Sequence, residues 1–281
     1  MVISASRRTD VPAFHAEWLV ERLRAGTVDV PNPFDPKRVR RVSLAPADVD
    51  CLVLWTKDPR PLMERLDALE AFPFYFQFSL NAYGRDVEPG VPPLDARVDA
   101  FLRLADRIGP ERVVWRCDPV LLSPAHPPAF HEEAFAALAA RLDGATDACV
   151  LSFVDEYPRV RRAMRALGLR APEPEEALAL AAAFAAAARP HGLALSACAE
   201  PLDLAPLGIP PARCVDPVRI RRISGRAVPD GKDKAQRPAC GCAPSVDIGT
   251  YGTCGHGCVY CYAQRAARPG GAVGPMEPAS R

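Results

Sequence analysis

The sequence has little net charge and no long apolar run, and both absences limit what the protein can be. Its 35 Lys and Arg nearly balance 34 Asp and Glu, for a formal net charge of +1, so no global field favours nucleic acid or a membrane surface. No apolar stretch is long enough to span a bilayer. The first residues lack a basic region followed by an apolar one, so we expect a cytoplasmic protein with no membrane partner. Local basic patches leave nucleic acid open as a partner.

Histidine is also scarce, with 5 residues in 281, whereas cysteine is plentiful, with 10. In a chain without an export signal, so many cysteines argue against a disulfide framework and for metal ligation or buried thiols. His15, His126, His131 and His191 show no metal-ligand spacing, so we expect them to be structural. Cysteine thiolates are therefore the candidate metal ligands.

Short apolar runs with β propensity alternate with segments of helical period. The expected strands are Val2–Ser6, Cys51–Thr56, Phe74–Leu80, Arg112–Cys117, Ala148–Val154, Gly192–Ala199 and Ser245–Tyr251. The expected helices are Phe14–Ala25, Pro61–Ala71, Leu94–Ile108, Pro128–Leu142, Pro158–Leu167 and Glu173–Arg189. This alternation predicts an α/β protein with a parallel sheet and helices outside it. At this length a complete or partial β/α barrel of the TIM-barrel type is the leading architecture, and a doubly wound open sheet is the alternative.

The most informative motif lies near the end of the chain, where Cys254, Cys258 and Cys261 are spaced C-x3-C-x2-C. Three thiolates in a compact loop can hold three irons of a [4Fe–4S] cluster and leave the fourth iron open. Soft thiolates also select zinc or Cu(I), and zinc is the main alternative. Zinc usually takes four ligands in two C-x2–4-C pairs, and the nearest other pair is the tighter Cys240-Gly-Cys242, so the spacing favours iron–sulfur.

Four other cysteines lie in late loops or at a strand end: Cys198, Cys214, Cys240 and Cys242. The last two are close enough in sequence to share a metal. We expect the four to converge if they hold a second [4Fe–4S] cluster or a zinc ion, and to be unrelated buried thiols otherwise. Cys51, Cys117 and Cys149 lie within expected strands and are assigned to the core.

Polar side chains gather at the ends of the expected strands, which is where parallel β/α folds carry their chemistry. Period-two alternation along Phe74–Leu80 places Gln77, Ser79 and Asn81 on one face, opposite the phenylalanines. We expect this polar face to look into the barrel. The other polar residues at strand ends are Thr9, Asp10, Lys57, Arg116, Asp118, Asp155 and Glu156.

We expect one domain over residues 1–267, because neither a linker nor a change in composition divides the chain before about residue 225. The stretch Gly225–Pro244 is polar and loop-like, and 225–267 is the expected cluster-binding region. Residues 268–281 are expected to form a flexible tail.

At the cysteine loop the chain resembles the radical S-adenosylmethionine superfamily, whose signature is C-x3-C-x-aromatic-C, with Tyr260 at the aromatic position. The run His256–Ala263 looks most like the branch that contains spore photoproduct lyase, and so do Trp55–Asp58 and Phe78–Asn81.

Nearly the whole chain is also similar to an uncharacterised bacterial family that carries a domain of unknown function. The opening run Ser4–Asp10, the run Lys232–Arg237 and the closing cysteine motif carry that similarity. It names a family and implies no activity.

The superfamily resemblance implies that the three-cysteine motif ligates a [4Fe–4S] cluster whose open iron binds S-adenosyl-L-methionine. Reductive cleavage would give methionine and a 5′-deoxyadenosyl radical, which abstracts hydrogen from a small-molecule or unknown substrate. Tyr260 would pack near the adenine, Lys57 would pair with the methionine carboxylate, and Ser79 and Asn81 would hydrogen-bond nearby. An electron donor such as flavodoxin or ferredoxin is the implied partner.

In most of that superfamily the cysteine motif follows the first barrel strand, whereas here it follows the last. Circular permutation is the simplest account, and it predicts Val2–Ser6 beside Ser245–Tyr251 as parallel neighbours. Two other functions stay open. One is a non-catalytic iron–sulfur or zinc protein for electron transfer or regulation, and the other is a nucleic-acid repair lyase, by analogy alone.

Overall fold

The protein is described by a computed structural model that covers residues 1–281 except 34, 36, 265–275 and 277–281. Its centre is a seven-stranded sheet in the order β8-β7-β6-β5-β4-β1-β9, and every neighbouring pair is parallel. The strands are β1 (Val2–Ala5), β4 (Cys51–Thr56), β5 (Phe74–Ser79), β6 (Val113–Val120), β7 (Ala148–Phe153), β8 (Ala194–Ala197) and β9 (Val246–Asp247). The sheet is consistent with a partial β/α barrel whose edges are β8 and β9.

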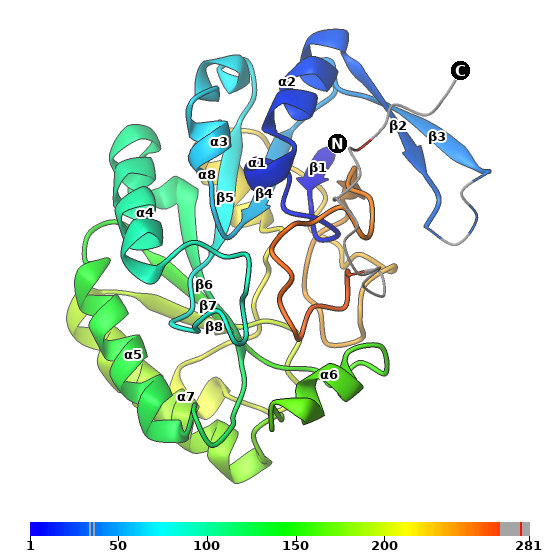
Figure 1. Ribbon diagram of the computed structural model, residues 1–281. Coiled ribbons are helices and arrows are strands. Elements are labelled where there is room, and N and C mark those ends of the chain that lie inside the picture. The colour runs from blue at the N-terminus through cyan, green and yellow to red at the C-terminus, as the bar shows by residue number, and fades with distance from the viewer. Residues whose placement is uncertain (34, 36, 265–275, 277–281) are drawn as a thin grey trace.

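The first and last strands of the chain lie side by side, as the sequence predicts. In the parallel register of β1 and β9, Ile3 is opposite Val246 and Ser4 is opposite Asp247. Strands from the two ends of the sequence therefore meet in the sheet. Because β1, β4 and β9 are parallel, the segments that follow them emerge at the same, carboxyl end of the strands (Figure 1).

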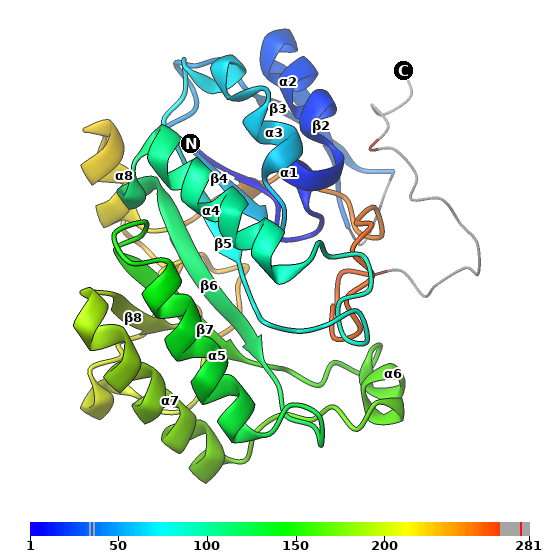
Figure 2. The same ribbon diagram turned by 60° about the vertical axis from the view of Figure 1, so that its left-hand side comes forward.

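The main helices pack on one face of this sheet (Figures 1 and 2). They are α2 (Ala16–Ala25), α4 (Leu94–Ile108), α5 (Pro128–Arg141) and α7 (Pro174–Ala188), joined by the short α1 (Val11–Phe14) and α3 (Arg60–Met63). Helix α8 (Pro217–Ser224) packs on the opposite face through Ile220, and α6 (Arg161–Ala166) packs beside the cysteine loop through Met164. Short 3-10 turns lie at Leu66–Leu69, Pro110–Arg112, Arg189–His191 and Ala205–Leu207. No described helix is long and apolar enough to cross a membrane.

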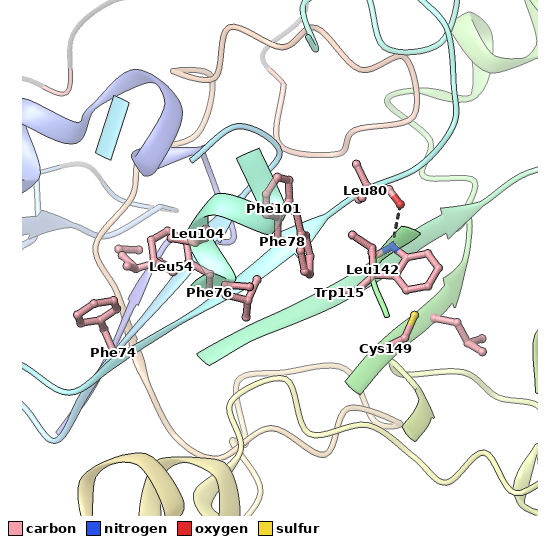
Figure 3. Packing of buried hydrophobic residues seen from close by; sticks show 14 of the residues in the cluster. Leu54, Phe74, Phe76, Phe78, Leu80, Phe101, Leu104, Trp115, Leu142 and Cys149 are labelled. Carbon is pink, nitrogen blue, oxygen red and sulfur yellow. Dashed lines mark hydrogen bonds between the residues drawn. The ribbon is translucent and has the colours of Figure 1, made fainter. Parts of the chain in front are cut away.

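The strand side chains alternate between two different environments. Along β5, Phe74, Phe76 and Phe78 are buried in the large core beneath the helices, where Trp115 also packs and donates its indole N–H to the Leu80 carbonyl (Figure 3). Tyr75 faces the other way, into a second buried cluster. The alternation explains why both faces of the central strands are apolar: helices cover one face and the chain from 198 to 243 covers the other.

The second cluster joins the concave side of the sheet to the late loops. Its strand residues are Val2, Cys51, Val53, Tyr75, Val114 and Val150, and its loop residues include Ala212, Cys214, Val215, Ile220, Cys240 and Cys242. As expected, residues 225–244 carry no helix or strand, so side-chain contacts rather than a hydrogen-bond ladder must position this segment.

Several expected elements differ from those observed. The expected helix Phe14–Ala25 breaks at His15, and Phe14, the first residue of that range, is 40% exposed at the end of α1. Helix α7 buries the stripe of Leu180 and Phe184 and leaves Leu178 40% exposed. The expected strand Ser245–Tyr251 shrinks to β9.

Three elements were not expected at all or took another form. The antiparallel hairpin of β2 (Thr27–Pro31) and β3 (Val39–Ser43) was missed because only Val28 and Val42 are buried in it, so no apolar run marks its strands, and prolines lie beside them. Helix α8 was missed inside a proline-rich stretch. The expected helix Pro61–Ala71 splits into α3 and a 3-10 turn. The expected flexible tail 268–281 lies outside the described residues except for Met276, which is buried.

Candidate metal and cofactor site

The three-cysteine loop follows β9 at the carboxyl end of the parallel sheet and is fixed there by the chain that follows β5. The Val259 N–H donates to the Val87 carbonyl (3.0 Å), and the Gly90 N–H donates to the His256 carbonyl (2.8 Å). A Cβ atom on Gly90 would lie 2.6 Å from the Gly255 carbonyl oxygen, so this approach of two backbones requires glycine. The loop is therefore a packed part of the fold.

The three thiols of the loop are shielded from water. Cys258 is buried, and Cys254 and Cys261 are half-buried. Burial raises the pKa of Cys254 to about 12 and also raises the pKa values of Cys258 and Cys261, while the nearby Lys57 ammonium opposes the shift at Cys258. Among the described contacts, no sulfur–sulfur hydrogen bond joins these three thiols, although each of them lies near enough to another to affect its pKa.

Glu88 is the charged centre beside this loop. Its carboxylate is 1% exposed and lies 2.9 Å from the Lys57 Nζ and 3.8 Å from an Arg97 nitrogen. It also accepts a hydrogen bond from the Tyr260 hydroxyl. Burial opposes the carboxylate charge, but the attraction of Lys57 and Arg97 outweighs it and lowers the Glu88 pKa. The same partner raises the pKa of Lys57 against its own desolvation. The Glu88 carboxylate thus connects the cysteine loop with the residue after β4, the segment after β5 and helix α4.

Sequence reasoning missed Glu88 and Arg97. Glu88 lies in an irregular loop where no period marks it, and its burial depends on Lys57, 31 residues away, and on Tyr260, 172 residues away. Arg97 did carry a signal, because it stands between Leu94 and Phe101 on the buried stripe of α4. A cation on an apolar helix face indicates a buried anionic partner.

Asp10 is a second anchor for the loop. One carboxylate oxygen caps α1 through the Ala13 N–H (3.0 Å), and the other accepts the Lys57 backbone N–H (2.7 Å) and pairs with His256 Nε2 (2.8 Å). His256 therefore binds a carboxylate rather than a sulfur, and loop geometry explains its position between the cysteines. Asp10 ties the ends of β1 and β4 to the cysteine loop.

The predicted cofactor residues are only partly brought together. Lys57 lies 5.8 Å from the Tyr260 ring centroid, and both contact Glu88 beside Cys258. Ser79 is half-buried at the end of β5, on the same face as Gln77, and makes no described side-chain hydrogen bond. The buried Asn81 donates to the Asp118 carbonyl (3.0 Å) and lines a small cavity with Trp115 and residues of α5. The structure thus brings Lys57 and Tyr260 to the loop and places Asn81 toward the helix side.

The four late cysteines converge on the concave face of the sheet. The Cys214 thiol donates to the Cys198 sulfur at 3.4 Å, and the Val215 N–H donates to the Cys242 sulfur at 3.4 Å. The bond from Cys214 lowers the pKa of Cys198 to about 7, and the neighbouring Cys214 and Cys240 thiols lower the pKa of Cys242. Cys51 and Cys149 are core thiols, as expected, and Cys117 is half-buried beside the core.

Two guanidinium groups face this group of four thiols. Arg116 donates to the Cys214 sulfur (2.9 Å) and to Gln77 Oε1 (3.1 Å), and it also pairs with Asp118. Arg7 lies close enough to Cys242 and Cys214 for their charge to raise its pKa against its burial. Both guanidinium carbons lie over the Trp55 ring, at 5.2 Å for Arg7 and 5.0 Å for Arg116.

A carboxyl group with a raised pKa lies next to these thiols. Glu200, two residues after Cys198, accepts the Phe153 N–H (2.9 Å) and the Ser152 hydroxyl (3.0 Å), and burial raises its pKa to about 7. Between them stands Ala199, whose φ of 55° is in the left-handed region that non-glycine residues rarely adopt. A carboxyl that titrates near neutral pH at a strand end has the acidity of a proton donor or acceptor.

Within the described ranges, no group of three or more His, Cys, Asp or Glu side chains has the arrangement to hold one metal ion as it stands. The loop sulfurs are not grouped tightly enough for a single ion, and the four late thiols form a row of contacts rather than a closed shell. A [4Fe–4S] cluster spaces its cysteine ligands more widely than one ion does, so sulfurs too far apart for a single ion are compatible with a cluster in the loop.

Comparison with known proteins gives a family but no activity. No curated protein matches the chain. The crystal structure of a triazine hydrolase variant is similar over 63% of this chain and 43% of that one, at 20% identity and a TM-score of 0.30, a likeness too weak to carry an argument. The family described as "Domain of unknown function (DUF1848)" matches residues 2–263. The chain belongs to this family.

Proposed function

We propose that the protein is a radical S-adenosylmethionine enzyme acting on an unknown substrate. The observation that carries the proposal is the position of the C-x3-C-x2-C loop, which follows a parallel strand at the carboxyl edge of a β/α sheet and packs beside Lys57 and Tyr260. Carboxyl edges of parallel strands are where such folds bind ligands and carry out chemistry.

The residues that would hold the group are Cys254, Cys258 and Cys261. The donor set fits a [4Fe–4S] cluster with one open iron, because the motif supplies three soft sulfurs and no fourth cysteine. Among the described residues these sulfurs form no group tight enough for a single ion, which suits the wider spacing of a cluster. When bound, such a cluster supplies one electron to the sulfonium of S-adenosylmethionine, whose carbon–sulfur bond breaks to give methionine and a 5′-deoxyadenosyl radical.

The chain's own residues would position this chemistry and exclude water. Glu88 holds Lys57, Arg97 and Tyr260 in one buried network, so the loop is fixed against the strand ends before any ligand binds. Lys57 keeps its ammonium charged, and we propose that it attracts the methionine carboxylate while remaining paired with Glu88. Tyr260, whose hydroxyl is held by the same carboxylate, would present its ring to the adenine.

The chain order fits the proposal if the fold is circularly permuted. In this reading β9 corresponds to the superfamily's first strand and β1 to its second, and their parallel pairing supports it. The superfamily resemblance implies that the electron comes from a small redox protein such as flavodoxin or ferredoxin.

Anaerobic reconstitution with iron and sulfide, followed by reduction with dithionite, tests the proposal. The wild type should bind about four irons in the loop and form 5′-deoxyadenosine from S-adenosylmethionine. Cys258→Ala should form none, whereas Cys149→Ala, which changes a buried core thiol on the helix side, should keep the activity. A wild type with a full cluster that forms no 5′-deoxyadenosine would refute the proposal and favour a role in electron transfer or regulation.

A further inference from the structure

A second sulfur site lies apart from the three-cysteine loop. Cys198, Cys214, Cys240 and Cys242 come from three separate stretches of chain, at the end of β8, before α8 and before β9, yet all four lie in a row of neighbouring sulfurs in the second buried cluster, where Cys214 donates to Cys198 and the Val215 N–H donates to Cys242. The proposed radical chemistry uses none of them. Thiols that are merely buried have no reason to gather from three stretches of a chain with 10 cysteines.

We propose that these four cysteines form a tetrathiolate site for a single tetrahedral metal ion of the Zn²⁺ type. The spacing decides between an ion and a cluster. Thiolates on one ion with metal–sulfur bonds near 2.3 Å lie about 3.8 Å apart, whereas a cubane cluster holds its cysteine sulfurs much farther apart. The Cys198 and Cys214 sulfurs are 3.4 Å apart, which is close to the single-ion value.

The backbone around each ligand is already fixed. The Cys198 N–H donates to the Leu151 carbonyl (2.8 Å), and the Asp233 N–H donates to the Cys242 carbonyl (2.8 Å). A Cβ on Gly241 would lie 3.0 Å from the Ala212 carbonyl oxygen, so glycine between Cys240 and Cys242 lets this pair approach the Cys214 segment. We propose that rotation about the Cα–Cβ bonds, among three staggered positions, turns the row of sulfurs into a tetrahedron when the ion binds.

The surroundings match the charge of such a site. Four thiolates around a divalent ion carry a formal charge of −2, and binding releases the thiol protons to solvent. Arg116 and the Val215 N–H already donate to the Cys214 and Cys242 sulfurs, at 2.9 and 3.4 Å. The Arg7 NH2 nitrogen is buried without a described hydrogen-bond partner, beside the same sulfurs. An unpartnered guanidinium nitrogen is costly unless an anion faces it, and the tetrathiolate provides one.

The site would fasten the chain that covers the concave face of the sheet. Residues 225–244 have no helix or strand, yet they bring Cys240 and Cys242 into the buried cluster with Tyr75 and Val53. A metal crosslink between this segment, the end of β8 and the loop before α8 would hold it without a hydrogen-bond ladder, as structural zinc does in small domains.

The test uses the full chain and Co²⁺ as a spectroscopic substitute for Zn²⁺. Wild type and Cys258→Ala, both freed of metal and kept reduced, should each bind one Co²⁺ with the visible absorption of a tetrahedral thiolate site, and Zn²⁺ should displace it. Cys214→Ser and Cys240→Ser should lose this absorption. Cys51→Ser makes the same change in the same buried cluster outside the row of sulfurs and should retain it.

Three results would overturn the inference. The first is a Co²⁺ absorption that is unchanged in Cys214→Ser and Cys240→Ser, and the second is an octahedral or absent Co²⁺ absorption in the wild type. The third is about four irons with sulfide retained by reconstituted Cys258→Ala, which would mean that a second cluster binds here. If the serine variants fail to fold, the wild type alone decides. Zn²⁺ should then protect four thiols from a thiol reagent and raise the thermal midpoint of the metal-free protein, and no protection would refute the site. Because Cys258→Ala lacks the proposed cluster, this outcome does not depend on the radical chemistry.

Discussion

Replacing Glu88 by glutamine removes the negative charge that Lys57 and Arg97 share beside the cysteine loop. Their nitrogens lie 2.9 and 3.8 Å from its oxygens. At an effective dielectric constant of about 20, these distances correspond to roughly 6 and roughly 4 kcal/mol of Coulomb attraction before desolvation is counted. Desolvation of the three ions offsets much of this gain. Removing one partner of a buried pair still costs about 3–5 kcal/mol, because the remaining charges stay buried and uncompensated. We expect a loss of this size for Glu88→Gln.

Urea unfolding followed by circular dichroism measures the loss, with the change in midpoint converted through the slope m of each variant. Glu176→Gln is the matched control, because Glu176 is paired with Arg170 at the surface, where an ion pair contributes little. If Glu88→Gln loses no more stability than Glu176→Gln, the Glu88 network does not fix the loop and the argument for a preformed site is wrong.

The pH dependence gives an independent check on the same network. Because the pKa of Glu88 is lowered from its usual 4.5, its charge contributes stability that is present above pH 4.5 and is lost as the pH falls through the folded-state value. The difference in unfolding free energy between wild type and Glu88→Gln should therefore be greatest near neutral pH and should shrink in acid. A difference that stays constant down to acid would mean that the Glu88 charge is not the source of the stability.

Two further changes test other parts of the structure. Burial raises the pKa of Glu200 from 4.5 to about 7, so its ionisation should lower the wild-type thermal midpoint as the pH rises from 4.5 to about 7. Glu200→Gln should lack that decline, and an equal decline of the midpoint in both proteins would contradict the prediction. Gly90→Ala places a Cβ 2.6 Å from the Gly255 oxygen and should cost about 1–3 kcal/mol in urea unfolding. Gly231→Ala, with nothing within 4 Å of its Cβ, should stay within about 0.5 kcal/mol, and equal losses would mean that the loop moves freely.

The elements that could be predicted from the sequence are those with a strong pattern of burial. The strand Cys51–Thr56 and the helix Leu94–Ile108 have the same bounds in prediction and structure, because one is apolar throughout and the other has a wide apolar stripe with Gly109 behind it. The β2–β3 hairpin gave no such signal. Its strands are held by their pairing across the turn and by burial of Val28 and Val42 in the main core, which a single-strand pattern does not reveal.

In the candidate site, too, only the residues with a local sequence signal could be predicted. The three-cysteine motif could be read from its spacing, and Lys57 from its place after a strand, because both signals are local. The partners of Lys57 could not, since Glu88 and Arg97 reach it through tertiary contacts that no period encodes. The convergence of Cys198 and Cys214 with the Cys240–Cys242 pair was expected only if they share a metal, and sequence spacing gave no reason to choose an ion over a cluster.

The opening run of the chain explains how the two sulfur sites depend on one fold. Its residues lie between them: the Arg7 carbonyl accepts the Tyr262 hydroxyl from the cysteine loop (3.0 Å), while the Arg7 guanidinium turns toward Cys242. Asp10 binds His256 on the loop side, and Ser4 and Ser6 both donate to Asp247 of β9. A run of polar residues directly after a buried strand would be costly unless each side chain had a partner. Here the partners of Ser4, Ser6, Arg8 and Asp10 lie between Asp247 and His256, so contacts with the C-terminal segment stabilise the conformation of this run.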